Sequence, residues 1–174
     1  MVEFRKRIKV AIRQISEGDA EKFLFLMRQL EEETKFMMCE PGERKTTLEE
    51  QAKRIRDILS SDSQTILVAE DDATLVGFVG AFGFNVRRRR HCLHVVIGTL
   101  QTYSGLGIGT MLMEALEHWA RENNIRRLEL TVITRNEPAL ALYRKMGFEI
   151  EGTKKASLLV DSELVDEFYM AKLL

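Results

Sequence analysis

The sequence predicts a single α/β domain, residues 1–174, in which helices cover the faces of a mixed β-sheet. Three observations support this fold class. A chain of 174 residues suits one compact domain. Two β-rich segments joined by a short polar turn predict an antiparallel hairpin, and strand–helix–strand patterns follow. Hairpins imply antiparallel pairing and strand–helix–strand units imply parallel pairing, so together they indicate a mixed sheet.

The N-terminal segment predicts a short strand followed by two helices. Lys9–Gln14 is typical of a strand, and Asp19 is predicted to be the N-cap of a helix that runs to about Lys35. A loop is expected over Phe36–Arg44, which contains a Pro-Gly pair. Thr47-Leu48-Glu49-Glu50 matches the capping-box pattern, so a second helix is expected to begin there.

The rest of the chain predicts further strands and helices. Turn residues separate the strands of two hairpins, at Asp71-Asp72 and at Asp161-Ser162, and a proline begins the last helix with a glycine after it. The strands are expected at Thr65–Ala69, Thr74–Phe82, His91–Gly98, Arg127–Ile133, Phe148–Leu159 and Leu164–Leu173, and the helices at Thr110–Asn123 and Pro138–Met146.

Composition argues against several classes of function. Lys and Arg total 26 and Asp and Glu total 27, so the net charge of −1 gives no general attraction to nucleic acid or an acidic membrane. No apolar run approaches the roughly 18 residues of a membrane span, and Met1–Arg7 lacks the apolar core of a signal peptide. Cys39 and Cys92 are too few for a disulfide scaffold and are expected to be buried thiols. We therefore expect a cytoplasmic protein with no nucleic-acid or membrane partner.

Glycines alternate in one segment before a predicted helix, Ser104-Gly105-Leu106-Gly107-Ile108-Gly109-Thr110. Glycine lets the backbone curl, and exposed amides at a helix N-terminus form a site for phosphate or pyrophosphate. The alternative is that the loop is only a tight entry to the helix. The segment does not match a P-loop because no lysine follows Gly109, and its G-x-G-x-G spacing departs from the dinucleotide fingerprint.

This loop and a second motif together resemble the GNAT N-acetyltransferase superfamily. The loop occupies the family's cofactor motif, Q/R-x-x-G-x-G/A, with Ser104 in place of the usual Gln or Arg. The second motif is Asn136-Glu137-Pro138-Ala139-Leu140-Ala141-Leu142-Tyr143-Arg144-Lys145-Met146-Gly147-Phe148, which is similar to N-x-x-A-x-x-x-Y-x-x-x-G-F in the family. The resemblance, which extends from about Thr65 to Leu174, implies a mostly antiparallel central sheet of about six or seven strands flanked by about four helices.

The resemblance implies that the ligand is acetyl-coenzyme A. Its pyrophosphate would be held by the backbone amides of Ser104, Gly105, Leu106, Gly107, Ile108, Gly109 and Thr110. Its pantetheine arm would pair with the backbone of Ile97, Gly98 and Thr99 as an additional strand. This mode requires the sheet to open between the His91–Gly98 and Arg127–Ile133 strands. Asn136 would hydrogen-bond the arm, or it would cap its own helix.

Tyr143 is the candidate general acid, because acetyl transfer from a thioester needs a group that protonates the leaving thiolate. A phenol titrates near pH ~10 and a thiol near ~8.5, so Tyr143 stays protonated until the thiolate forms. Alternatively, its ring packs against Leu140 and Phe148. No general base is assigned. Thr131 stands where members that modify protein N-termini often carry glutamate, and Glu129 either shares that face of the strand or pairs with an arginine.

Three other features have competing interpretations. Arg87–Arg90 would hold an acidic acceptor or a cofactor phosphate, or it forms a solvated connection, as charge runs usually do. His91 falls on the opposite face of its strand from Cys92 and His94, so no metal site is predicted. Met37-Met38 lies in a region that often borders the acceptor in this family, but it serves equally well as packing.

We therefore expect an N-acetyltransferase that moves an acetyl group from acetyl-coenzyme A directly to a primary amine of a small molecule or a protein N-terminus, without a metal or a covalent enzyme intermediate. The alternative is a non-catalytic module that binds acyl-coenzyme A or regulates through it, and Tyr143 favours the enzyme. The resemblance also raises the expectation of a homodimer. The slight negative charge modestly favours a cationic small amine as acceptor.

Overall fold

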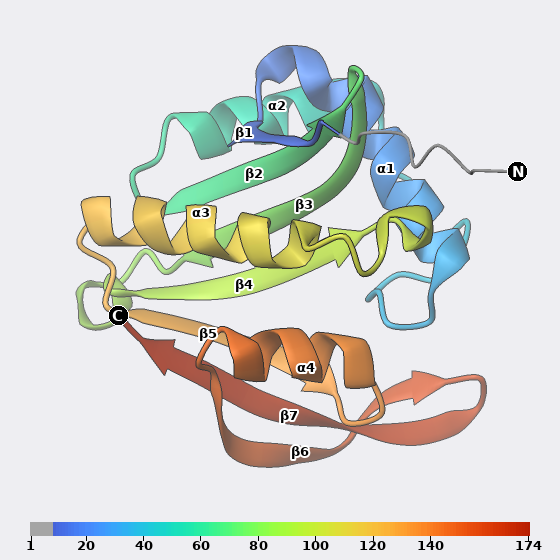
Figure 1. Cartoon of the computed structure of the whole chain (residues 1–174), viewed down its shortest axis with the longest axis vertical. Helices are drawn as coiled ribbons and strands as arrows, with labels where there is room; N and C mark the ends of the chain where they lie inside the picture. The colour runs from blue at the N-terminus through green and yellow to red at the C-terminus, as the bar shows by residue number, and fades with distance from the viewer. Residues whose placement is uncertain (1–8) are drawn as a thin grey trace, which may run out of the picture.

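The computed structural model describes residues 9–174, which form a seven-stranded sheet with helices on both faces (Figure 1). The strands are β1 (Ala11–Gln14), β2 (Gln64–Asp71), β3 (Thr74–Gly83), β4 (Cys92–Thr99), β5 (Arg127–Ile133), β6 (Glu149–Val160) and β7 (Glu163–Leu173), and the helices are α1 (Ala20–Glu33), α2 (Leu48–Leu59), α3 (Ile108–Glu122) and α4 (Glu137–Lys145). The order in the sheet is β1-β2-β3-β4-β5-β7-β6. Within these residues β4 and β5 pair in parallel and the other neighbours pair antiparallel, which confirms the predicted mixed sheet.

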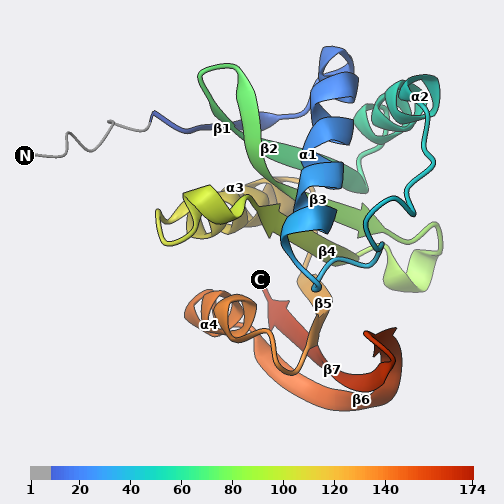
Figure 2. The same cartoon turned by 90° about the vertical axis from the view of Figure 1, so that its right-hand side faces the viewer.

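The helices divide between the two faces of the sheet. α1 and α2 lie on one face, and α3 and α4 lie on the other (Figures 1 and 2). Gly98 of β4 faces α1, because a Cβ at this position would lie 2.9 Å from Leu30 Cδ1. Strand alternation then turns Leu93 and Val95 toward α3, and both are buried. His94 consequently points to the same face as Gly98, toward α1.

The predicted capping residues of two helices are confirmed. Thr47 Oγ1 accepts a hydrogen bond from the Glu50 amide at 3.2 Å, and the Glu50 carboxylate accepts one from the Thr47 amide at 2.8 Å. Asn136 caps α4 by accepting from the Ala139 amide at 3.3 Å. Gly147 ends the same helix with a φ of +84°, a conformation that residues with a Cβ adopt only with strain.

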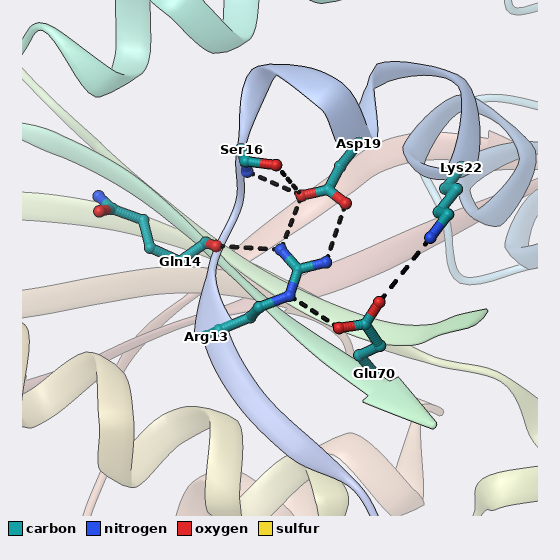
Figure 3. A network of polar contacts seen from close by, with 6 residues as sticks. All are labelled: Arg13, Gln14, Ser16, Asp19, Lys22 and Glu70. Atoms are coloured by element: carbon teal, nitrogen blue, oxygen red, sulfur yellow. Dashed lines mark hydrogen bonds and ion pairs between the residues drawn. The ribbon is translucent and has the colours of Figure 1, made fainter. Parts of the chain in front are cut away.

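Asp19 directly precedes α1 as predicted, but its side chain does not cap that helix. It accepts hydrogen bonds of 2.8 Å from both the amide and the hydroxyl of Ser16 (Figure 3). The Arg13 guanidinium binds both carboxylate oxygens, at 2.7 and 2.9 Å, and also donates from Nε to Glu70 at 2.8 Å. Hydrogen bonds from Arg13 hold the pKa of Asp19 well below its usual range, and the Ser16 donors add to this effect. The Arg13 guanidinium therefore joins β1 to both Asp19 of the 3₁₀ turn and Glu70 of β2.

Element boundaries differ from the prediction in places. Gly109 lies inside the first turn of α3, which begins at Ile108, rather than in the preceding loop. The first hairpin turns at Asp72 and Ala73, both with positive φ, one residue later than predicted. Short 3₁₀ turns at residues 17–19, 87–89 and 101–103 were not expected from the sequence. Such turns hold few residues and leave little periodic signal.

The expectations that came from composition are only partly addressed by the structure. No helix within residues 9–174 combines the length and the apolar character that crossing a membrane requires. Met1–Arg7, on which the signal-peptide interpretation depends, lies outside the described residues. Cys92 is buried as expected, whereas Cys39 is only half-buried.

The sheet opens between β4 and β5. Pairing between these strands is limited to Cys92 with Arg127, Leu93 with Leu128 and His94 with Glu129. Beyond these pairs β4 continues to residue 99 and β5 to residue 133, each without the other as a partner. Figure 2 shows the result as two bodies, one built on β1–β4 and one on β5–β7. The opening that the pantetheine hypothesis requires is therefore present.

Candidate functional site

A cavity of about 1540 Å³ lies where β4 and β5 separate. Its walls come from both bodies. One side is formed by the end of α1 with the segment that follows it and by α2, and the other by β5 and the β6–β7 hairpin. The N-terminal ends of α3 and α4 complete the lining. A site at this junction can receive groups from two directions.

The glycine loop forms the end of the cavity at α3. Gly105 and Gly107 have φ angles of +75° and +81°, so the backbone turns here in a way that favours glycine. The α3 ladder of hydrogen bonds starts with the Met111 amide, which donates to the Gly107 carbonyl at 3.0 Å. The three preceding helical amides, 108–110, have no acceptor within the helix, and no side chain caps Gly107. This donor set fits an anionic oxygen group.

Contacts between α3 and α4 bring a cation to this loop. A Cβ on Gly109 would lie 2.9 Å from Leu142 Cδ2, so glycine permits the close approach of the two helices. Lys145, at the end of α4, donates from Nζ to Thr110 Oγ1 at 3.1 Å. Its ammonium group therefore stands beside the open amides, where it favours a phosphate. The sequence analysis did not single out Lys145, because this contact depends on how two helices pack.

Most of the predicted cofactor-binding residues line this one cavity: Ile97, Gly98, Thr99, Ser104, Gly105, Gly107, Ile108, Gly109, Thr110 and Asn136. Leu106 does not line it, and its side chain is 49% exposed. The Gln101 amide is taken by Glu33 at 2.7 Å, which fixes the chain between β4 and the loop. The edge of β4 from Val95 to Thr99 faces the opening without a strand partner, so its backbone can accept an additional strand.

Tyr143 also lines the cavity, from the buried side of α4. It is 6% exposed, and its ring centre lies 5.8 Å from that of Phe148. Burial raises the pKa of the Tyr143 phenol to about 12. The packing role and the acid role are therefore compatible, because the ring is held by Phe148 while the residue still borders the cavity.

Glu129 is engaged by arginines. Arg127 Nε donates to it at 2.9 Å, and Arg89, from the basic run, forms a second ion pair with it. Burial raises the pKa of Glu129, but these arginine hydrogen bonds and charges outweigh that effect and lower it overall. Arg89 also lies 3.7 Å over the Phe84 ring, so part of the basic run is anchored rather than free in solvent. Glu129 and these arginines do not line the cavity, whereas Thr131 does, and Thr131 carries no titratable group.

The same structural elements occur in a known family. The sequence profile described as "Acetyltransferase (GNAT) family" matches residues 25–148, which is most of the chain. The chain belongs to the GNAT acetyltransferase family. The predicted family resemblance is therefore confirmed.

Relatives of this GNAT protein differ in how much of their length they share with it. Over 110 residues it is 37% identical to the L-amino acid N-acetyltransferase AaaT of Escherichia coli (strain K12), covering 61% of this chain and 66% of that protein. It spans between half and two-thirds of the length of the curated relatives it matches.

Solved structures match almost the whole GNAT fold. The acetyltransferase of the GNAT family from Streptococcus pneumoniae superimposes with a TM-score of 0.93 at 31% identity, covering 95% of this chain and 100% of that one. The yncA protein of Salmonella typhimurium, solved with its cofactor acetyl-CoA, shares the fold with a TM-score of 0.84 at 14% identity, covering 95% and 94%. These matches confirm the predicted fold class.

Among the titratable residues of the GNAT cavity that were not assigned to it from the sequence, His94 and Glu167 border the point where β4 and β5 separate or lie buried beside it. His94, interpreted from the sequence as structural, lines the cavity and belongs to the last residue pair before β4 and β5 separate. Burial lowers the pKa of its imidazole, although the charges of Glu129 and Glu167 oppose this. Glu167 of β7 is 4% exposed and accepts from Ser157 Oγ at 2.8 Å. A charged residue at a buried position of an alternating strand is the signal that could have identified it.

Proposed function

We propose that this protein transfers an acetyl group from acetyl-coenzyme A to a primary amine of a small molecule or a protein N-terminus. One observation carries the proposal: the open amides of the glycine loop, the unpaired edge of β4 and the buried phenol of Tyr143 all border the same cavity. These three features match the three parts of the donor, which has an anionic pyrophosphate, an extended arm with amide groups and a thioester.

Donor binding would mainly use backbone groups that lack protein partners. The pyrophosphate would lie at residues 105–110, at the α3 N-terminus, where Lys145 adds a positive charge. The Ser104 amide, predicted to belong to this set, already donates to the Gln101 carbonyl at 3.0 Å. The amide-containing arm would pair with the backbone of Ile97, Gly98 and Thr99 as a strand pairs with a sheet edge. Asn136 Oδ1 keeps its capping hydrogen bond with the Ala139 amide in this arrangement. The contact of Asn136 with the arm would therefore come from its side-chain Nδ2.

In the proposed reaction the amine nitrogen forms a bond to the acetyl carbon as the carbon–sulfur bond breaks. Burial raises the pKa of Tyr143 to about 12, so the phenol is protonated at neutral pH and can donate a hydrogen bond to the leaving sulfur. Because a thiol titrates near ~8.5, a separate phenolate would not persist. Tyr143 therefore passes its proton to the sulfur as it takes one from solvent.

The amine must also lose a proton, and we assign its acceptance to His94. The lowered pKa of this imidazole keeps it neutral near pH 7, so a ring nitrogen has a free lone pair. Its position in the last β4–β5 pair, at the apex of the opening, supports this assignment, because the amine would approach the thioester there. Glu167 is a weaker candidate because Ser157 and Lys154 already occupy its carboxylate.

The competing function is a non-catalytic module that binds acyl-coenzyme A. Calorimetric titration with acetyl-coenzyme A, followed by a thiol-release assay with a panel of amines, separates the two. The Tyr143→Phe variant should keep the donor affinity of the parent within about twofold and lose about 100-fold in kcat. Donor binding without turnover on any amine would favour the binding module. An unchanged rate in Tyr143→Phe would overturn the acid assignment.

Location and assembly also belong to this proposal. We place the protein in the cytoplasm, which is consistent with two free thiols. Residues 1–174 are proposed to act as one domain, since one apolar cluster extends from Ile15 to Met170. A homodimer would cover the outer strand β6 and its neighbour β7, where Ile150, Leu159 and Leu164 are exposed. Size-exclusion chromatography with light scattering tests the assembly.

A further inference from the structure

The α2 wall of the cavity contains a buried hydrogen-bond donor without an acceptor. Gln51 is 2% exposed and lines the cavity, and its Nε2 has no hydrogen-bond partner among residues 9–174. Buried amide groups are almost always paired, because an unpaired one has lost its hydration and gained nothing in return. An unpaired donor at a cavity wall therefore indicates a ligand atom that accepts a hydrogen bond.

Three arginines line the same cavity, and two of them, Arg44 and Arg54, come from the side formed by α2 and the segment before it. Arg54 follows Gln51 by three positions, so both side chains project from one side of α2. Arg44 is held by the buried carboxylate of Glu31, to which its Nε donates at 2.7 Å. Among the ion pairs of residues 9–174, none includes Arg54. This wall therefore combines donors with an uncompensated positive charge.

The position of Arg54 is fixed relative to the proposed reaction centre. Its guanidinium carbon lies 5.7 Å from the centre of the Phe82 ring. Phe82 is the β3 partner of His94, and neighbouring strands lie about 4.8 Å apart. His94 in turn belongs to the last pair before the sheet opens. The cationic wall is thus about one strand away from the point where the amine would react.

Most other charged side chains around the cavity have partners of opposite sign, whereas Glu33 accepts from the Gln101 amide and Lys145 donates to the Thr110 hydroxyl. The pairs are Lys35 with Asp161, Arg135 with Glu163 and Lys154 with Glu167. A polyamine would bring a second positive charge to a wall that offers it donors and Arg54. An acceptor with an anionic oxygen group would pair with both. The segment after α1 adds apolar surface to the cavity, from Phe36 and Met37.

We propose that the acceptor is an α-amino acid with an apolar side chain, whose carboxylate is bound by Gln51 and Arg54, with Arg44 adding to the positive wall. This inference rests on the proposed acetyl transfer, since it names the acceptor of that reaction. The carboxylate lies on the carbon that bears the amine, so binding it to the α2 wall directs the nitrogen toward His94 and the opening. The apolar side chain then lies against Phe36 and Met37.

Matched acceptors test the proposal directly. L-Phenylalanine and phenethylamine differ only in the carboxylate, and L-phenylalaninamide keeps the shape without the charge. With coenzyme A present, calorimetry should show L-phenylalanine binding at least about tenfold more tightly than either analogue. The thiol-release assay should give the same order of kcat/KM, with spermidine below L-phenylalanine. Equal or tighter binding of phenethylamine would overturn the proposal.

Variants of α2 show whether these residues are responsible. Gln51→Leu and Arg54→Met should each raise the KM for L-phenylalanine about tenfold or more, and should leave the KM for phenethylamine and for acetyl-coenzyme A within about twofold. Arg56→Met, on the same helix but paired with Glu17, is the matched control and should change none of these values. An equal rise in the KM for L-phenylalanine and for phenethylamine would contradict the specific role.

The two proposals can fail separately. If L-phenylalanine binds selectively and Gln51→Leu removes the selectivity, but no amine is acetylated, then the carboxylate site stands and the acetyl transfer does not. If amines are acetylated without regard to the carboxylate, then the acetyl transfer stands and the α2 assignment is wrong.

Discussion

The two bodies of the molecule differ in how they bury their strands. In the body built on β1–β4, β2 and β3 are buried along nearly their whole length, because helices cover both of their faces. In the body built on β5–β7, no residue of β6 is buried, and one helix, α4, covers one face. The first body is therefore a closed core, and the second presents an open face to the cavity. A strand that is buried on both faces carries mainly apolar side chains and presents few reactive groups. A strand with one open face can place charged residues such as Glu167 at the border of the site.

The functional groups divide along the same line. The glycine loop, the β4 edge and the α2 wall belong to the closed body, which would hold donor and acceptor in place. Tyr143 belongs to the open body, which would supply the acid. His94 stands where the two are joined. Most of the binding groups and the acid thus come from different bodies, although Asn136 and Lys145 of α4 also take part in donor binding. Three variants can challenge this division.

Truncation of a leucine should show the largest difference between the two bodies, measured as the loss of free energy of unfolding. Leu93 of β4 is 0% exposed, and Leu159 of β6 is 65% exposed. Leu93→Ala should lower the free energy of unfolding by about 3 kcal/mol, because it removes buried methyl groups and leaves a cavity. Leu159→Ala should lower it by less than about 0.5 kcal/mol. Urea denaturation followed by circular dichroism measures both, and similar losses would mean that β6 is covered in solution, as in a dimer.

Substitution of His94, which lies where the two bodies are joined, should have the second-largest effect, and this effect is on catalysis. If His94 accepts the proton of the amine, the wild-type kcat/KM falls as pH drops through its folded-state pKa, which burial places below the ordinary value of about 6.5. In His94→Gln this acidic limb should disappear and kcat near pH 7.5 should fall about 100-fold. His118→Gln, on the exposed surface of α3, is the control. An acidic limb that persists in His94→Gln would assign it to another group.

Removal of the Asp19 charge, which pairs with Arg13 in the closed body, should have a smaller effect on stability. The folded-state pKa of Asp19 is depressed, so its contribution to stability is complete above the ordinary carboxyl pKa and is lost as pH falls through the folded value. Asp19→Asn should cost about 2 kcal/mol at pH 7, and its difference from wild type should shrink below about pH 4. Asp62→Asn, at an exposed position, is the control. A difference that stays constant with pH would exclude the charge as its source.

Local signals in the sequence predicted much of the fold and one end of the site. The capping box at Thr47, the cap at Asn136 and the alternating glycines each depend on residues within a few positions of one another, so the sequence contains their whole explanation. The family pattern then placed Tyr143. The role of Asp19 could not be predicted, because Arg13 approaches it from β1 while also binding Glu70, which is 57 positions away. The acceptor wall was missed for the same reason, since Gln51 is informative only once the cavity beside it is known.

The open edge of β4 has a consequence for the life of the protein in a cell. If the donor fills this edge as a strand, it binds the native chain and not the unfolded one, so mass action links stability to donor concentration. At a free concentration of 100 times Kd the gain is about 2.7 kcal/mol, comparable to a buried leucine. The population of chains open to proteolysis would then fall when acetyl-coenzyme A is plentiful and rise when it is scarce. Because β4 and β5 pair only in part, the amount of this protein in a cell would therefore rise and fall with the concentration of acetyl-coenzyme A.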